Sequence, residues 1–240
     1  MPEIKWYTNM NKKWIKIDPH VHSKGISGCS IVTCEQIIDE KIKLGYDGVV
    51  LTNHCQPWYY TEDKHAQFME QMIAEFQRGK IYADKKGFCF YMGIEVTLNI
   101  PHYVDWLLYG VTEDFLRNSP CLYLLSQKEL FEYCEKWGVV MIQAHPYRQS
   151  PCDPKYMHGV EINCSVEDLD KESLVVAFAK EHNLLVICGT DYHDVNKTFR
   201  GGIYIPETCK TSVDIAKWLY NEKRIKIFLE EKEMIYTRNS

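Results

Sequence analysis

The sequence lacks most of the features that mark membrane, secreted or nucleic-acid-binding proteins. No apolar run approaches the length of a membrane span, and the N-terminal stretch MPEIKWYTNMNKKWIKID has no long apolar segment of the secretory type. Acidic residues outnumber Lys and Arg by 33 to 28, a net charge of −5, so no basic excess calls for a nucleic-acid partner. No repeat or linker composition divides the chain. We therefore expect residues 1–240 to form one domain with no membrane partner.

The ten cysteines are scattered along the chain and include no CxxC pair. Several cysteines lie inside apolar runs such as FCFYMG and LLVICG. This placement favours buried, reduced thiols over a disulfide framework, and reduced thiols are typical of the cytoplasm. We expect a cytoplasmic protein.

Short apolar runs alternate with helical patterns along the chain. Capping boxes predict helices over 33–45, where Thr33 pairs with Gln36, and over 126–138, where Ser126 pairs with Glu129. Further helical patterns cover 61–80, 170–183 and 213–223, and strands are expected at 47–54, 88–96, 104–111, 138–145, 159–165, 183–193, 201–206 and 225–229. The strand at 104–111 begins too soon after the strand at 88–96 for a helical crossover to connect them. The alternation predicts an α/β fold with a mainly parallel sheet, open or closed into a barrel.

Histidines and acids stand at the ends of several predicted strands. The run IDPHVHS places two histidines one residue apart, so that both can point to the same face of a strand. The other candidates each end a different strand, and the complete set is His20, His22, His54, Glu95, His145, Asp191 and His193. Each one taken alone could be a helix cap, a satisfied core histidine or a surface acid. In a parallel barrel, however, these strand ends meet on one face.

The chemistry of this set indicates metal binding. Imidazole and carboxylate ligands suit Zn, Mn or Fe. Seven candidate ligands exceed the four of a closed structural zinc site, which suggests more than one ion. Paired ions can bind the attacking and leaving oxygens of a displacement and can lower the pKa of a bound water. The pattern therefore predicts metal-assisted hydrolysis.

The motifs DPHVHS, LTNH, GIE, QAHP and GTDYH, in this order, resemble those of the PHP (polymerase and histidinol phosphatase) family of metal-dependent phosphoesterases. The resemblance spans Asp18 to Gly202, most of the chain. It implies a distorted (β/α)7 TIM-like barrel of the PHP type. It also implies one to three divalent metal ions at the carboxyl ends of the strands, where metal-activated water hydrolyses a phosphoester.

The resemblance also assigns roles to individual residues. It gives a first metal the ligands His20, His22, Glu95 and Asp191. Glu95 would bridge to a second metal that also takes His145, and a third metal would take His54 and His193. Either of these last two histidines is expected to protonate the leaving alkoxide. Asp18 would support the site as an acceptor behind the ligands or as a cap of the strand end.

Two positions depart from the family pattern. The loop after HxH has Ser27-Gly28-Cys29 where many members carry an acid or a histidine. Cys29 could replace that ligand as a thiolate or be an ordinary loop cysteine. The strand after Glu95 lacks the histidine that many members have, and His102 could replace it or face solvent.

Outside the metal set, Arg148 in QAHPYR is a candidate for binding the substrate phosphate, with an ordinary surface arginine as the alternative. The acidic balance favours a small phosphorylated substrate, while a nucleotide or nucleic-acid end remains possible. Two other functions fit parts of the pattern. One is an amidohydrolase that cleaves C–N bonds, since those enzymes also open with HxH. The other is an inactive metal-binding barrel, suggested by the two departures.

Overall fold

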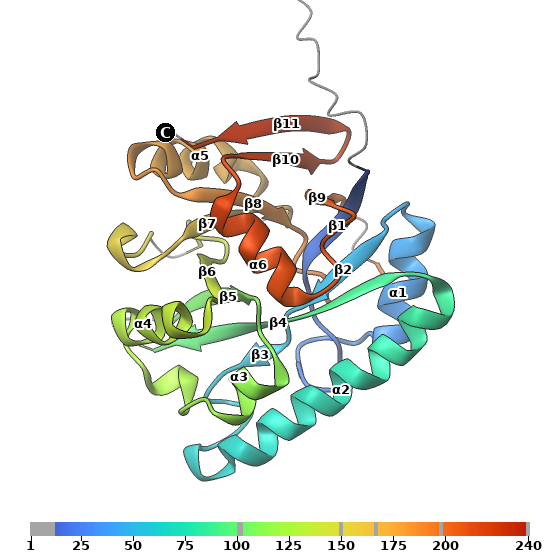
Figure 1. The fold of residues 1–240 in the computed structure, drawn as a ribbon, viewed down its shortest axis with the longest axis vertical. Coiled ribbons are helices and arrows are strands. Elements are labelled where there is room, and N and C mark those ends of the chain that lie inside the picture. The colour runs from blue at the N-terminus through green and yellow to red at the C-terminus, as the bar shows by residue number, and fades with distance from the viewer. Residues whose placement is uncertain (1–12, 100–102, 149–150, 166–167, 197–198, 239–240) are drawn as a thin grey trace, which may run out of the picture.

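The computed structural model describes residues 13–99, 103–148, 151–165, 168–196 and 199–238. Seven strands in this part of the chain follow one another around a ring (Figure 1). They are β1 (Trp14–Val21), β2 (Gly48–Leu51), β4 (Cys89–Leu98), β5 (Val104–Tyr109), β6 (Val140–Gln143), β7 (Gly159–Asn163) and β8 (Leu185–Gly189). A parallel bridge from Val21 to Tyr192 joins the two ends of this ring. The predicted distorted barrel is confirmed, as a sheet that nearly closes on itself.

The sheet is mainly parallel in its seven-stranded ring, with one exception. β1, β2 and β4 pair in parallel, as do β6, β7 and β8, but β5 runs antiparallel to both β4 and β6. The connection from Leu98 to Val104 is too short for a crossover helix, so β5 must reverse direction, as the sequence predicts. Because of this reversal, the first residues of β5 lie beside the carboxyl ends of the parallel strands. Asp105, for example, pairs with Thr97 near the end of β4.

Helices cover the outside of the sheet (Figure 1). They are α1 (Cys34–Lys43), α2 (His65–Lys86), α3 (Glu113–Arg117), α4 (Gln127–Trp137), α5 (Glu172–Glu181) and α6 (Ser212–Asn221). Both predicted capping boxes are present, with Thr33 before α1 and Ser126 before α4. α2 begins and ends later than predicted, because a 3₁₀ turn at Glu62–Lys64 precedes it and the left-handed Gly87 (φ 66°) ends it.

Three antiparallel strands extend the sheet beyond β1. They are β9 (Gly201–Pro206), β10 (Arg224–Leu229) and β11 (Lys232–Thr237), and β9 pairs with β1. The sequence predicts β9 and β10 but not β11. Only Tyr236 of β11 is buried, where its hydroxyl donates to the Leu184 carbonyl oxygen at 3.0 Å, so the strand has no alternating apolar signal.

The remaining strand, β3 (His54–Cys55), pairs in parallel with β4 beside Glu95. The cysteines are all free, as predicted, and seven of the ten are buried. Among the helices of the described ranges, none combines the length and apolar character that crossing a membrane requires.

Candidate metal centre

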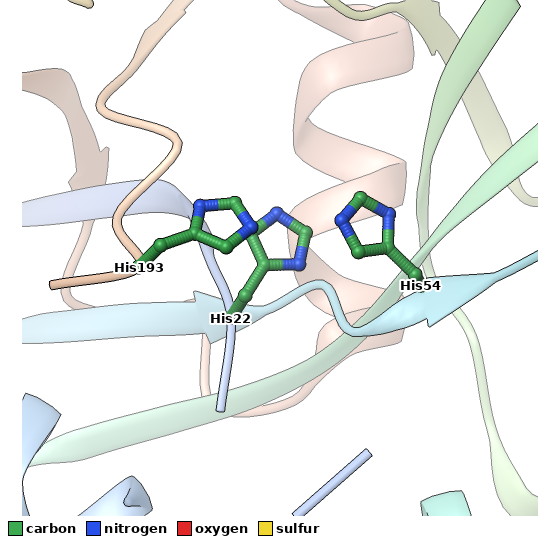
Figure 2. Close-up of side chains that lie close together, drawn as sticks. All are labelled: His22, His54 and His193. Atoms are coloured by element: carbon green, nitrogen blue, oxygen red, sulfur yellow. The ribbon is translucent and has the colours of Figure 1, made fainter. Parts of the chain in front are cut away.

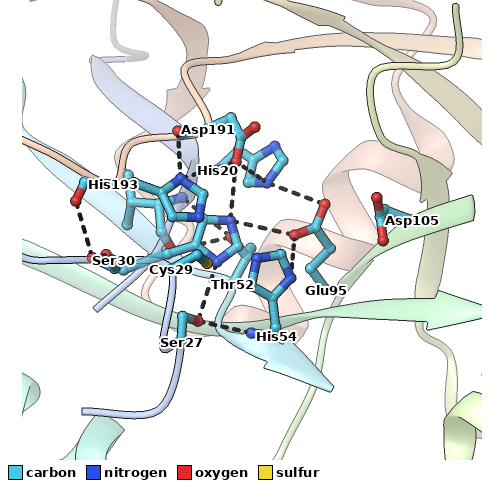
Figure 3. A network of polar contacts seen from close by, with 12 residues as sticks. His20, Ser27, Cys29, Ser30, Thr52, His54, Glu95, Asp105, Asp191 and His193 are labelled. Carbon is cyan, nitrogen blue, oxygen red and sulfur yellow. Dashed lines mark hydrogen bonds and ion pairs between the residues drawn. The ribbon is translucent and has the colours of Figure 1, made fainter. Parts of the chain in front are cut away.

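The seven predicted ligands gather at one end of the ring, and Figure 3 shows His20, His54, Glu95, Asp191 and His193 among them. His20 and His22 lie at the end of β1, Glu95 lies in β4 beside His54 of β3, and His145 follows β6. Asp191 and His193 follow β8. Together with Asp105, they form three groups of possible ligands. Two of the groups share His22, and two share Glu95. Residues separated by up to 173 positions therefore face one small volume, as the strand-end pattern predicts.

The first group contains His20, His22, Glu95 and Asp191, and all four side chains are buried. Nε2 of His20 lies 3.4 Å from Oε1 of Glu95 and 3.3 Å from Oδ1 of Asp191. Nε2 of His22 lies 3.4 Å from Oε2 of Glu95 and 3.3 Å from the same Asp191 oxygen. Donors about 2.1 Å from a tetrahedral ion would be about 3.4 Å apart. The spacing therefore fits a divalent cation between them.

The atoms with which these side chains face one another form no hydrogen bonds within the ranges that the structure describes, although Oε2 of Glu95 lies 2.9 Å from Nδ1 of His54. Nε2 of His20, Nε2 of His22 and both carboxylate oxygens of Glu95 are buried without a hydrogen bond in the described part of the chain. Leaving a buried polar atom unsatisfied costs about 1–3 kcal/mol, and more for a charged one. Several such atoms around one point are explained by a cation that they coordinate. The residues present therefore fit the metal that the motifs imply.

The second group contains Glu95, Asp105 and His145. Nε2 of His145 lies 3.4 Å from Oε1 of Glu95 and 3.8 Å from Oδ2 of Asp105. Asp105 also accepts a hydrogen bond from the Thr97 hydroxyl at 2.6 Å. Asp105 is absent from the predicted ligand set. The available signal was an acid within the apolar strand VDWLLYG, at the reversed end of β5.

The third group contains His22, His54 and His193, and Figure 2 shows His22 between the other two rings. The ring of His22 stacks on His54 with centroids 4.3 Å apart and on His193 with centroids 4.2 Å apart. Nδ1 of His193 is 2.8 Å from the Asp191 carbonyl oxygen, a contact in which the ring donates. His54 and His193 thus lie at the rim, where their side chains keep 13% and 14% of their surface exposed, and His22 is buried between them.

A buried glutamate, Glu161, orients two of these histidines from behind. Its Oε1 is 2.7 Å from Nδ1 of His20, which leaves Nε2 of that ring facing Glu95 and Asp191. Its Oε2 accepts the backbone N–H of His145 at 3.1 Å. Gly189 of β8 permits this approach, because a β-carbon there would lie 2.4 Å from the Glu161 carboxylate. Glu161 is likewise absent from the predicted site residues.

Asp18 acts on the backbone and not on a ligand ring. Its Oδ1 accepts the N–H groups of His20 and Thr190, each at 3.2 Å. Its Oδ2 accepts from Nζ of Lys41 in α1 at 2.5 Å, and Lys41 also donates to the Thr190 hydroxyl. Asp18 and Lys41 are both fully buried. This ion pair joins the ends of β1 and β8, and of the two predicted roles for Asp18 the strand-end cap is the one observed.

Arg148 contacts the centre through Asp191. Its Nη2 lies 3.0 Å from Oδ2 of Asp191, and its Nε donates to Oδ2 of Asp168 at 2.8 Å. Asp191 therefore presents Oδ1 to the histidines and Oδ2 to the arginine. The guanidinium fixes the orientation of this carboxylate, a contact that the sequence does not reveal.

Of the two residues considered as replacements for missing family ligands, Cys29 and His102, the structure describes Cys29. The thiol of Cys29 accepts a hydrogen bond from the Tyr59 hydroxyl at 3.4 Å and interacts with the side chains of His54 and His193. Burial raises the pKa of this thiol, but the bonds to the two histidines outweigh burial and lower it to about 5. His102 lies outside the described residues.

Two candidate ligands have a backbone conformation that residues other than glycine seldom adopt. His145 (φ 29°) and Asp191 (φ 52°) both have positive φ. Such conformations cost about 1–3 kcal/mol each and concentrate at functional sites. Here they turn each side chain inward just after its strand has ended.

The buried acids and imidazoles shift one another's pKa values. Burial would raise the pKa of Glu95, but His20 and His54 beside it hold that pKa well below its usual range. Asp191 has its pKa lowered in the same way by His20 and His22 against the effect of burial. Burial lowers the pKa of His54, but Glu95 and Cys29 outweigh it and raise the value to about 10.

Because neutral imidazole is the form that binds metal, adding Zn²⁺ at pH 7 should release the proton that His54 holds. Metal affinity should then rise with pH until His54 is neutral, near pH 10. Calorimetric titration of the metal-free protein in two buffers of different ionisation enthalpy measures the released protons. We expect His54→Asn to release about one proton fewer. Equal release from both proteins would show that His54 is neutral at pH 7.

Comparison with protein-family models gives no match, and comparison with curated proteins gives none either. Solved structures do match. A two-domain protein from Bacteroides vulgatus, described as containing a predicted PHP-like metal-dependent phosphoesterase, superposes with a TM-score of 0.65 at 21% identity. The match covers 91% of this chain and 65% of that protein, so this chain spans about two thirds of its length.

Two further matches carry other activities. The lesion-specific endonuclease EndoQ from Pyrococcus furiosus has a TM-score of 0.58 at 16% identity, over 90% of this chain and 58% of that one. An amidohydrolase from Chromobacterium violaceum, with bound sulfate and no metal, has a TM-score of 0.56 at 14% identity, over 89% and 97%. At these identities the likeness establishes the fold, which is the barrel that the motifs predict.

Proposed function

We propose that this chain, which has the fold of PHP-like phosphoesterases, is a metal-dependent hydrolase of phosphoesters. The observation that carries the proposal is the buried Glu95, whose two unsatisfied oxygens face histidines of more than one ligand group. A carboxylate shared in this way supports adjacent cations. The phosphoesterase described for the Bacteroides protein and the endonuclease activity of EndoQ support the same class of reaction.

Up to three divalent ions would bind to the three groups. His20, His22, Glu95 and Asp191 would hold the first, Glu95, Asp105 and His145 the second, and His22, His54 and His193 the third. Such ions supply positive charge that lowers the pKa of a coordinated water and neutralises phosphate oxygens.

The side chains at the rim would transfer a proton to the leaving group and bind the substrate phosphate. With the third group empty, His54 or His193 can carry a proton to the leaving alkoxide, because both rings are partly exposed. His193 would use Nε2, since its Nδ1 is engaged with the Asp191 carbonyl oxygen. Arg148 would place Nη1 on a phosphate oxygen, while its Nε and Nη2 stay on Asp168 and Asp191.

The substrate we propose is a small phosphomonoester or a nucleotide or oligonucleotide end. The net charge of −5 gives no long-range attraction for a polyanion, so recognition would be local to the phosphate. A small phosphorylated molecule fits this balance better than a duplex.

The second candidate is an amidohydrolase, which the likeness to the Chromobacterium protein favours. Such sites commonly use a carbamylated lysine as a bridging ligand. The buried Lys41 is paired with Asp18 and is therefore not available as such a ligand. Glu95 and Asp105 would supply the carboxylate ligands instead, which supports the phosphoesterase.

Parallel assays test the proposal. Metal-free protein reloaded with Mn²⁺, Zn²⁺ or Fe²⁺ is incubated with p-nitrophenyl phosphate, bis-p-nitrophenyl phosphate and p-nitroacetanilide. We expect nitrophenol release from a phosphate ester that requires metal, and no amide cleavage. Amide cleavage alone would establish the amidohydrolase. Full metal occupancy without turnover of any substrate would identify an inactive metal-binding barrel.

A further inference from the structure

We propose that the substrate of this centre is a nucleotide whose base stacks on the exposed indole of Trp58, in a cavity beside the metal ligands. The inference rests on the proposed function and narrows its substrate to phosphoesters that carry a nucleobase. It gives a role to the aromatic segment that follows His54, between β3 and α2 (Figure 1).

An open cavity of about 410 Å³ lies between this segment and the first turns of α2. Its aromatic lining comes from Trp58, Tyr59, Tyr60 and Phe68. Cavities that bind small molecules usually have about 300–1,000 Å³ and combine apolar or aromatic walls with a few polar groups. This cavity therefore has the size and the lining that a planar ring requires.

The indole of Trp58 is the surface on which we place the base. Its side chain is 58% exposed, and the ring of Tyr103, which is 47% exposed, packs against it with centroids 4.8 Å apart. Tyr103 directly precedes β5, so two distant segments bring two exposed rings together. Single exposed apolar residues are ordinary, but neighbouring ones at a cavity mark an interaction site. Aromatic side chains that remain open to solvent are the usual platforms for stacking a base.

The segment that carries Trp58 is anchored on both sides of the indole. The ring of Tyr60 stacks on Phe68 of α2 with centroids 4.2 Å apart, and the Tyr60 carbonyl oxygen accepts from the Tyr123 hydroxyl at 3.0 Å. The Tyr59 hydroxyl oxygen accepts the backbone N–H of Cys29 at 3.1 Å. Trp58 is therefore exposed on a fixed support, as a binding platform requires.

Tyr59 and Gln56 place the cavity next to the metal ligands. Tyr59 lines the cavity, and its ring meets His54 edge-on with centroids 6.1 Å apart. The side-chain oxygen of Gln56 lies 3.3 Å from the hydroxyl of Thr97, which donates to Asp105. The same segment thus borders two of the three ligand groups. A phosphate at the centre and a base on Trp58 would lie on either side of Tyr59, joined by the sugar of the nucleotide.

Polar groups in the cavity favour a base over a purely apolar substituent. Gln67 and Gln71 both line it, and they lie four residues apart on α2, so they share one face of the helix. Each side-chain amide offers both a donor and an acceptor, which is the combination that the edges of nucleobases match. A hydrocarbon chain would leave these amides without partners.

Substrate comparison tests the base site. Protein loaded with Mn²⁺ is assayed with 5′-AMP, 3′-AMP and ribose 5-phosphate, which lacks a base. We expect the wild type to prefer one of the two nucleotides. In Trp58→Ala the ratio of kcat/KM for that nucleotide over ribose 5-phosphate should fall roughly 10-fold, and Trp58→Phe should restore most of it because it keeps a ring. The control is Tyr220→Ala, an aromatic residue of α6 that is 55% exposed and should leave the ratio at the wild-type value.

Tryptophan fluorescence measures the stacking without turnover. A phosphonate analogue of the preferred nucleotide, in which CH₂ replaces the bridging oxygen, should quench the fluorescence of the wild type but not that of Trp58→Phe. An unchanged ratio in Trp58→Ala, or quenching that persists in Trp58→Phe, would overturn the base site and leave the phosphoesterase proposal standing. Quenching that depends on Trp58, without hydrolysis of any ester, would support the base site and overturn the hydrolase.

Discussion

Glu95→Gln should lower metal-dependent phosphoesterase activity by on the order of 10³-fold, well beyond the roughly 10–100-fold cost of losing a residue behind a ligand. Glu95 is fully buried, and its oxygens lie 3.4 Å from His20, His22 and His145 and 2.9 Å from His54. Glutamine keeps the shape but removes the negative charge shared by two ligand groups. It also directs an N–H₂ donor toward the cations. The kcat/KM for a phosphate ester with added Mn²⁺ measures the effect.

Metal content separates this interpretation from a folding defect. After dialysis, Glu95→Gln should retain fewer ions per chain than the wild type, with an unchanged far-ultraviolet circular dichroism spectrum. The matched control is Glu132→Gln in α4, where the glutamate is exposed and pairs with Lys128 at 3.7 Å. The control should behave as wild type. Near-normal turnover and full occupancy in Glu95→Gln would rule out a bridging role for this carboxylate.

Lys41→Met should reduce the free energy of unfolding by about 3–5 kcal/mol, the usual cost of removing one partner from a buried ion pair. Lys41 is fully buried, and its ammonium donates to Asp18 and Thr190. Methionine fills a similar volume but leaves the Asp18 carboxylate charged in the interior. Urea denaturation of the metal-free protein measures the loss. Lys43→Met, at an exposed position of the same helix, should change stability by less than about 0.5 kcal/mol.

The double variant Asp18→Asn/Lys41→Met isolates the pair. Because both charges are then gone, its loss of stability should be smaller than the sum of the two single losses. Asp18→Asn alone should also weaken metal binding, since Asp18 accepts the backbone N–H groups of His20 and Thr190 beside the ligands. Strict additivity of the two substitutions would mean that the ion pair contributes nothing to the fold.

The sequence alone determined the local elements and most of the candidate ligand set. Thr33 and Ser126 start their helices as predicted, because a capping box is complete within four residues. His20 and His22 reach one point because alternate residues of a strand share a face. Glu95, His145 and Asp191 join them because the carboxyl ends of parallel strands meet at one rim of a barrel. The ordered motifs were sufficient for the fold, which the solved structures match.

Only the tertiary structure decided the partners of these ligands. Three charged residues show this: Asp105 and Glu161 lie in apolar strands, and Lys41 lies in an amphipathic helix. The periodicity of the sequence does not distinguish them from charged residues that face solvent. Asp105 faces Glu95 because β5 reverses and pairs in a definite register with β4. Glu161 reaches His20 across 141 residues, and Lys41 reaches Thr190 across 149. Contacts of this range depend on strand order and barrel closure, which the neighbouring residues in the sequence do not encode.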